Sequence, residues 1–238
     1  MSLVPLRRFT PARIALGRAG SGLPTEAHLQ FSLDHAMARD AVHAALDFAA
    51  LAAALERRGW RSLQVASAAA DRDQYLRRPD FGRRLSPSSR AALGTAPACD
   101  VVLVAADGLS AAAVAAHLLP LLDVLMPRLA GVGPVVLAAQ GRVALGDEIG
   151  ELLRARLAIL LIGERPGLSS PDSLGCYVTF QPRVGTMDSA RHCISNIRAQ
   201  GLAIPDAAEA IARLAADALA LRATGLELER RRAPALLA

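Results

Sequence analysis

The sequence predicts an α/β fold, in which a doubly wound and mostly parallel sheet follows an N-terminal helical arm. The chain has 238 residues, of which 53% are hydrophobic, so it is long and apolar enough to bury a core of its own. From about residue 60 onward, short continuous runs of Val, Leu and Ile alternate with longer helical patterns. That alternation is typical of parallel strands whose two faces are both covered by helices.

The first part of the chain, residues 1–60, lacks such strands and predicts the helical arm. Arg13–Pro24 is rich in glycine and indicates a turn, and Thr25 has the side chain of an N-cap for a helix after that turn. An alanine-rich helix is expected from Ser32 to Arg58, with Gly59 as its C-terminal stop. The glycines of the turn have the order GxxGxG and no βαβ unit surrounds them, which favours a plain turn over a phosphate loop.

Residues 61–225 are expected to form one Rossmann-like domain of alternating strands and helices. Strands are predicted at Ser62–Ala68, Asp100–Gly108, Pro134–Gly141, Leu157–Gly163 and Cys176–Pro182. Helices are predicted at Leu109–Leu129, Asp147–Ala155 and Asp206–Thr224, and Asp188 is expected to cap a further helix over DSARHCISNIR. Residues 226–238 are expected to form a loose C-terminal tail.

Three of the predicted strands end alike, with a glycine among polar residues. These ends are Asp107-Gly108-Leu109-Ser110, Gln140-Gly141-Arg142-Val143 and Gly163-Glu164-Arg165-Pro166. Because parallel strands deliver their carboxyl ends to one edge of a sheet, the three ends should line a shared crevice. Glycine there lets the backbone approach a ligand closely. Glu164 is therefore a candidate binding group; the alternative is a solvated ion pair with Arg165 or with an arginine doublet.

The charged residues of the chain exclude some classes of function. Basic residues outnumber acidic ones by 27 to 22, which gives a net charge of +5, and every basic residue is arginine. Without lysine, the chain cannot be a pyridoxal-phosphate enzyme or an ordinary P-loop NTPase. Only 3% of the residues are aromatic, which disfavours a stacking surface for single-stranded nucleic acid. The alternative of a standalone basic α/β module that binds nucleotide or nucleic acid stays open.

Cysteine and histidine usage predicts neither a disulfide framework nor a metal site. Cys99, Cys176 and Cys193 show no CxxC spacing, which is typical of reduced thiols in a cytoplasmic protein. His35 and His43 share one predicted helix, but eight residues separate them by about 12 Å at the rise of an α-helix. No metal ligand set is therefore predicted.

No membrane span, secretory signal or complete catalytic set is predicted. The longest apolar segment, Leu109–Met126, is interrupted by His117, Pro120 and Asp123 and falls short of the roughly 20 apolar residues that a span needs. A GxSxG nucleophile elbow is missing from the sequence. No catalytic residue is assigned, and we expect the chain to hold part of a site that a second polypeptide completes.

Three long blocks resemble one known family. They are LRRFTPARIALGRAGSGLPT with HAMARDAVHAALD, then GPVVLAAQGRVALGDEIGELL, then LLIGERPGLSSPDSLGCYVTFQPRVGTMDSARHCISNIR. These blocks resemble the small (light) subunit of ethanolamine ammonia-lyase, and the resemblance covers residues 6–226. It implies a subunit of an adenosylcobalamin-dependent lyase that converts ethanolamine to acetaldehyde and ammonia by a radical mechanism.

The resemblance also implies a partner. In the family, a large subunit built as a TIM barrel binds ethanolamine, and cobalamin lies between the two chains. The assembly is similar to a hexamer of heterodimers. By this resemblance the helical arm contacts the large subunit, residues 61–225 bind cobalamin, and no nucleic acid or membrane is bound. An incomplete catalytic set in this chain would follow from that arrangement.

Three residues carry over from the family as cobalamin contacts. Val143 should offer backbone or apolar contact, Glu164 should accept hydrogen bonds from corrin amides, and Cys193 should pack against the cofactor from a helix beside the crevice. Each has a structural alternative: Val143 as the edge of the core, Glu164 as a surface ion pair, and Cys193 as a buried small hydrophobe.

Two features of the sequence bear on how the cofactor is held and where the protein works. The DxHxxG motif of enzymes that displace the lower base of cobalamin is missing, so the resemblance implies a cofactor that keeps its dimethylbenzimidazole on cobalt. Longer family members carry an N-terminal extension linked to bacterial microcompartments, whereas this sequence starts almost at LRRFTPAR. A cytoplasmic protein is expected, with packaging in a microcompartment left open.

Overall fold

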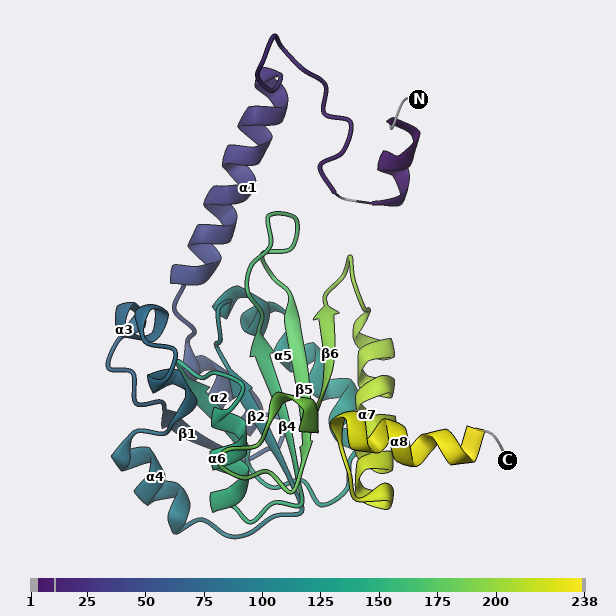
Figure 1. The fold of residues 1–238 in the computed structure, drawn as a ribbon. Coiled ribbons are helices and arrows are strands. Elements are labelled where there is room, and N and C mark those ends of the chain that lie inside the picture. The colour runs from purple at the N-terminus through teal and green to yellow at the C-terminus, as the bar shows by residue number, and fades with distance from the viewer. Residues whose placement is uncertain (1–3, 11, 237–238) are drawn as a thin grey trace.

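The computed structural model describes residues 4–10 and 12–236 and shows an α/β domain from which one long helix projects (Figure 1). The domain is a six-stranded sheet with helices on both faces. The α/β class predicted from the sequence is confirmed. The strands are β1 (Ser62–Ala66), β2 (Val101–Ala106), β3 (Val135–Ala139), β4 (Leu157–Gly163), β5 (Leu174–Phe180) and β6 (Arg191–Ile197).

The sheet is mixed, with the strand order β1-β3-β2-β4-β5-β6. The four strands from β1 to β4 run parallel, as predicted, whereas β5 pairs antiparallel with β4 and β6 pairs antiparallel with β5. The chain therefore turns back directly from β4 into β5, without the crossover helix that a further parallel strand would need. Because of these two strands, the Rossmann-like, doubly wound description is not confirmed.

Alternate side chains of the parallel strands point to opposite faces of the sheet and pack into two separate core layers. Leu103 and Ile159 face one layer, together with side chains from α2, α5 and α7. Val102 and Leu160 face the other layer, together with side chains from α4 and α6. Both faces of each central strand are buried, and for this reason the strands appear in the sequence as continuous apolar runs. The helices are α1 (Thr25–His43), α2 (Phe48–Glu56), α3 (Arg72–Arg77), α4 (Pro87–Gly94), α5 (Ala111–Leu125), α6 (Leu145–Leu152), α7 (Ile204–Leu221) and α8 (Gly225–Leu236), with 3-10 turns η1 (Val4–Phe9), η2 (Phe81–Arg83), η3 (Met126–Arg128) and η4 (Asp188–Ala190).

The N-terminal arm consists of α1 and the segment before it, and it stands away from the sheet (Figure 1). The single helix predicted from Ser32 to Arg58 is wrong, because the chain breaks after His43 and starts again as α2. The side chain of Asp47 accepts a hydrogen bond from the backbone N–H of Ala50 at 2.8 Å and so caps the second helix. α2 then packs on the sheet, and only α1 projects. Residues 1–3 and 11 of the predicted arm lie outside the described residues.

Two predictions for the C-terminal part are wrong. DSARHCISNIR forms η4 and strand β6 where a helix was predicted, because the free edge of β5 offers backbone partners along Arg191–Ile197. The tail predicted to be loose is helix α8 as far as residue 236, and Leu228 in it is fully buried. Residues 237–238 of that tail lie outside the described residues.

Helix α5 and the turn after it form the one stretch in the described part of the chain that is long and apolar enough to span a membrane. That stretch is Ala111–Arg128, with 18 residues. Four of its leucines are fully buried and contact the sheet layer: Leu118, Leu121, Leu122 and Leu125. Its apolar composition therefore has an explanation inside the protein, as a core helix.

Candidate functional site

The carboxyl ends of β2, β3 and β4 interlock at one edge of the sheet, as the sequence predicted. The backbone N–H of Leu109 donates to the carbonyl of Gly163 at 2.9 Å, which joins the ends of β2 and β4. Asp107 accepts a hydrogen bond from the backbone N–H of Gly141 at 3.3 Å, which joins the ends of β2 and β3. Gly108 has φ of +57°, and a Cβ there would lie 2.2 Å from the carbonyl oxygen of Gly163. Only glycine fits this approach.

Asp107 is a buried carboxylate behind this edge. Burial raises the pKa of Asp107 to about 6, while Arg72 and the backbone N–H groups of residues 140, 141 and 108 oppose the rise. Arg72 lies 3.5 Å from Asp107 and also donates to the carbonyls of Gly108 and Val42, both at 2.8 Å. Arg72 therefore ties the end of α1 to the edge of the sheet.

Stability is expected to fall as Asp107 ionises. The folded-state pKa of about 6 lies above the ordinary value of 3.8, so the folded protein holds more protons than the unfolded chain between these two values. The free energy of unfolding should therefore drop by about 3 kcal/mol as pH rises through this window, at 1.36 kcal/mol per unit of pKa shift. Urea unfolding of wild type and Asp107→Asn from pH 4 to 7 measures this, because the variant lacks the titrating group. A difference between the two proteins that stayed constant with pH would contradict the assignment.

A cavity of about 370 Å³ opens at the strand ends, and we refer to it as the strand-end cavity. Its lining includes Glu164, which follows the β4 end, and Val143, which follows the β3 end, so the two strand ends share a cavity as the sequence predicted. Tyr177 of β5 closes another side. Burial raises the pKa of the Tyr177 phenol, and neighbouring Cys193 and Glu164 act in the same direction, so this hydroxyl stays protonated. The other lining residues are Tyr75, Gly108, Leu109, Arg142, Ile162, Gly163 and Arg165.

Glu164 is held by polar contacts and not by an arginine. Its Oε2 accepts hydrogen bonds from the hydroxyl of Ser173 and from the backbone N–H of Asn196, the latter at 3.2 Å. In the part of the chain that the structure describes, Glu164 forms no ion pair, so the alternative of a solvated pair with arginine is wrong. A Cβ at Gly175 would lie 2.8 Å from Oε1 of Glu164, so this glycine leaves room for the carboxylate.

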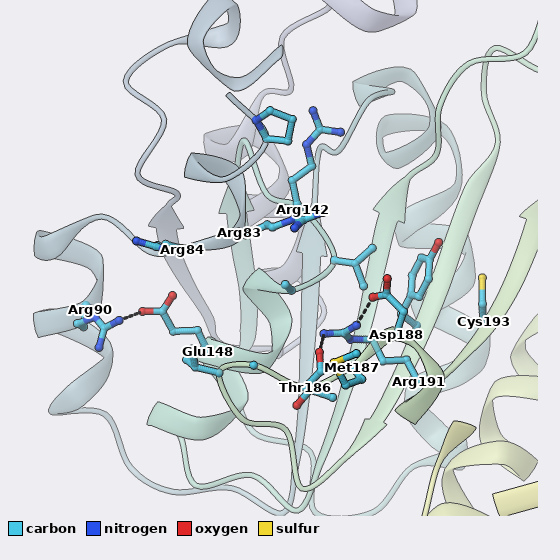
Figure 2. Close-up of a pocket in the computed structure, with 16 residues that line it drawn as sticks. Arg83, Arg84, Arg90, Arg142, Glu148, Thr186, Met187, Asp188, Arg191 and Cys193 are labelled. Atoms are coloured by element: carbon cyan, nitrogen blue, oxygen red, sulfur yellow. Dashed lines mark hydrogen bonds and ion pairs between the residues drawn. The ribbon is translucent and has the colours of Figure 1, made fainter. Parts of the chain in front are cut away.

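A second, larger cavity of about 940 Å³ adjoins the first, and we refer to it as the arginine cavity. The two share Arg142, Val143 and Tyr177 as lining residues, and Cys193 lines the arginine cavity (Figure 2). The remaining lining residues are Pro79, Arg83, Arg84, Arg90, Ala144, Glu148, Val184, Gly185, Thr186, Met187, Asp188 and Arg191.

The predicted site residues thus lie along one continuous surface, but Cys193 reaches it from another element. It lies on strand β6 and not on a helix, and it is exposed, so both the predicted helix and the alternative of a buried hydrophobe are wrong. Its sulfur lies 3.1 Å from the hydroxyl of Ser195. Val143 is half-buried and packs against the core layer of α6, so it is an edge of the core as well as a cavity wall.

Sequence reasoning missed Tyr75 and the role of Arg142. Tyr75 is fully buried between two guanidinium groups, with Arg72 and Arg142 at 4.8 and 4.2 Å from its ring centroid. Its hydroxyl donates to the carbonyl of Gly141 at 3.0 Å, and this hydrogen bond holds the segment that follows β3. Tyr75 lies on α3, in a segment for which no element was predicted, and nothing in its local sequence marks it.

The described residues contain no group of three or more His, Cys, Asp or Glu side chains that could hold a metal ion. The surface offers a carboxylate whose Oε1 accepts no hydrogen bond from a described residue, together with apolar, hydroxyl, thiol and guanidinium groups. This mixture can bind a ligand that carries both hydrogen-bond donors and acceptors.

Comparison with known proteins gives the family. The family model described as Ethanolamine ammonia-lyase light chain (EutC) matches residues 2–229. A protein named ethanolamine ammonia-lyase small subunit from Azotobacter vinelandii is 56% identical over 233 residues, which cover 94% of this chain and 86% of that protein. One of the same name from Pseudomonas aeruginosa is 52% identical over 235 residues, with 95% and 86% covered. This chain therefore belongs to the ethanolamine ammonia-lyase light-chain family, the small subunits of a lyase.

Proposed function

We propose that this chain is the small subunit of an adenosylcobalamin-dependent ethanolamine ammonia-lyase and forms one wall of the cobalamin site. A large subunit binds ethanolamine and completes that site. The observation that supports the proposal is the single surface at the ends of the parallel strands, where Val143, Glu164 and Cys193 lie in two adjoining cavities. Ligands of open α/β sheets bind at this edge.

The side chains at this surface fit the chemistry of a corrin. A corrin ring carries neutral carboxamide groups around its rim, each with N–H donors and a carbonyl acceptor. Both hydrogen bonds that Glu164 accepts from described residues end on Oε2, which leaves Oε1 to accept from a carboxamide. The glycine at position 175 leaves the space in which this carboxylate lies.

Two buried polar atoms lie near the strand ends, and one of them adds to the fit. Among the described residues, Nε of Arg142 and Oε1 of Gln140 are buried and have no hydrogen-bond partner. Buried polar groups are nearly always paired in folded proteins, so such atoms indicate a missing partner. Arg142 lines both cavities, so the carbonyl of a carboxamide bound there can accept from its Nε, whereas Gln140 lines neither cavity.

Bound adenosylcobalamin would supply a weak cobalt–carbon bond as the source of the radical chemistry. The residues of this chain bind and orient. Glu164 would hold the rim of the ring through carboxamide N–H groups, Val143 would pack against its apolar surface, and Cys193 would contact it from β6. Together with the backbone of the strand ends they exclude water from one side of the cofactor. No residue of this chain is assigned to the substrate.

The projecting arm is proposed to contact the large subunit. Helix α1 and the segment before it carry most of the large apolar side chains that the domain leaves exposed, and a patch of this kind marks a protein interface. The proposed assembly is a hexamer of heterodimers in the cytoplasm. The exposed apolar residues of the arm are Leu6, Phe9, Leu23, Leu29, Phe31, Leu33 and Met37.

The alternative, a standalone basic module for nucleotide or nucleic acid, is weakened because part of the arginine charge is neutralised within the chain. Arg58, Arg77 and Arg78 of the doublets pair with aspartates, and the tail triplet pairs with Glu227, Glu229 and Asp217. A nucleic-acid surface needs unpaired positive charge along one face.

Glu164→Ala is expected to weaken adenosylcobalamin binding by about tenfold to a hundredfold, the effect of losing a hydrogen bond to a charged group. Assembly with the large subunit should persist, because the side chain lies in a cavity wall at the strand ends and not on the arm. The measurement is equilibrium dialysis of the cofactor against the co-expressed pair of subunits, with size-exclusion chromatography to check assembly.

Glu56→Ala is the matched control, because Glu56 is an exposed carboxylate at the end of α2. It should bind cofactor as wild type does. Wild-type affinity in an intact Glu164→Ala complex would show that the assigned role is wrong. The function itself is tested by ammonia release from ethanolamine, which should require both subunits and adenosylcobalamin.

A further inference from the structure

The arginine cavity is strongly positive, and its charges are not all balanced. Five arginines and two carboxylates line it. Arg90 pairs with Glu148, and Arg191 pairs with Asp147 and Asp188, as Figure 2 shows for the pairs within the cavity. These contacts account for two of the arginines. The other three, Arg83, Arg84 and Arg142, form no ion pair with any residue that the structure describes.

The fold brings these three arginines to the lining of one cavity. Arg83 and Arg84 follow one another at the end of η2, and Arg142 follows the end of β3. The backbone N–H of Arg142 donates to the carbonyl of Gly82 at 2.8 Å, which fixes the two segments together. A Cβ at Gly82 would lie 2.7 Å from the side chain of Arg142, so the contact is close.

Three positive charges that line one cavity without carboxylate partners in the described part of the chain favour an anionic ligand there. Arg142 is oriented by the ring of Tyr75 and donates to the carbonyl of Tyr75 at 3.2 Å, yet its buried Nε has no partner in the described residues. Arg83 and Arg84 are exposed on the cavity side and free to rotate toward a ligand. Forked guanidinium groups bind phosphate oxygens in pairs. An anionic ligand with several oxygens fits this cavity.

We propose that the arginine cavity binds the phosphodiester of the nucleotide tail of cobalamin, with Arg83 and Arg84 as its contacts. This inference rests on the proposed function and extends it to a second subsite. The carboxamides at the corrin rim are neutral, whereas the tail joins an aminopropanol to the ribose of dimethylbenzimidazole through an anionic phosphodiester. The two cavities share Arg142, Val143 and Tyr177, so one ligand can extend from the strand-end cavity into the arginine cavity.

The test compares two corrinoids on the co-expressed pair of subunits. Hydroxocobalamin carries the nucleotide tail, and dicyanocobinamide has the same ring without it. R83Q/R84Q removes two positive charges from exposed side chains, and its effect on both corrinoids is measured by absorbance titration, with no turnover required. Hydroxocobalamin binding should weaken by about tenfold or more, as for lost charge-assisted hydrogen bonds, whereas dicyanocobinamide binding should stay within about twofold of wild type.

The control is R57Q/R61Q, which makes the same change of charge. Both arginines are exposed, and Arg61 precedes β1 at the opposite end of the sheet from the strand ends. This variant should bind both corrinoids as wild type does. If it weakened hydroxocobalamin as much as R83Q/R84Q, net charge and not the cavity would be the cause, and the inference would fail.

The remaining outcomes separate the inference from the function on which it rests. Equal weakening of both corrinoids by R83Q/R84Q, or no weakening of either, would overturn the tail subsite while leaving the cobalamin site in place. Failure of the wild-type pair to bind either corrinoid would overturn the proposed function and the inference together. If adenosine monophosphate, used as a free phosphate source, bound wild type as tightly as hydroxocobalamin and lost binding in R83Q/R84Q, the site would be a nucleotide site and the inference would be wrong.

Discussion

Arg191→Met is expected to lower the free energy of unfolding by about 3–5 kcal/mol, the range for removing one partner of a buried ion pair and leaving the other charged. Arg191 lies at the start of β6 with 8% of its surface exposed, and Asp147 on α6 is 2% exposed. The guanidinium donates to both oxygens of Asp147, to Asp188, and to the carbonyl of Thr186 at 2.7 Å. Methionine fills a similar volume but leaves Asp147 as an uncompensated charge in the core.

Urea unfolding of wild type and Arg191→Met at neutral pH measures the loss, and D147L/R191M is the matched control. The double variant removes both charges, so it should recover most of the lost stability. If it were no more stable than the single variant, the cost would come from lost packing and not from the unpaired carboxylate.

The loss should also depend on pH. Burial already raises the pKa of Asp147, and Arg191 opposes that rise through its hydrogen bonds and charge. Without Arg191 the folded-state pKa rises further, so the folded variant takes up a proton at a pH where the unfolded chain is ionised. Its stability deficit against wild type should therefore shrink as the pH falls from 7 toward 5. A deficit that grew on acidification would contradict this account.

The central strands could be predicted because burial on both faces leaves a clear mark in the sequence. The run LAILLIG has no polar residue and forms β4 with the predicted bounds, Leu157–Gly163. β6 could not be predicted in the same way, since its burial alternates irregularly and Arg191 and Ile197 are its only buried residues. Its strand conformation comes from pairing with β5, a tertiary effect that local propensity does not contain.

The candidate site likewise contains residues that the sequence could place and residues that it could not. Val143 and Glu164 follow predicted strand ends directly, so parallel topology alone was enough to place them on one edge. Arg83 and Arg84 come from a segment of short, polar elements between β1 and β2, for which the sequence predicted no structure. The arginine doublet was visible in the sequence, but only the fold shows that it lies against the β3 end, whereas Arg58, Arg77 and Arg78 of two other doublets pair with aspartates.

Gly163→Ala is expected to lower the free energy of unfolding by about 4 kcal/mol or more, well beyond an ordinary substitution. A Cβ at this position would lie 2.0 Å from the carbonyl oxygen of Ser110 and 2.5 Å from that of Asp107. Neither atom can rotate away, because both belong to the backbone that joins β2 to α5. Overpacking by a single methyl group typically costs about 1–3 kcal/mol, and here two backbone oxygens are overlapped.

The same change should also disturb the site, because Gly163 immediately precedes Glu164. Gly94→Ala is the matched control: Gly94 ends helix α4, and a Cβ there meets nothing within 4 Å. That variant should be neutral or gain about 0.5–1 kcal/mol from the better helix propensity of alanine. Thermal and urea unfolding of the two variants give the comparison. If Gly163→Ala were as stable as Gly94→Ala, the ends of β2 and β4 would not be interlocked. The placement of Glu164 at that edge of the sheet would then also be wrong.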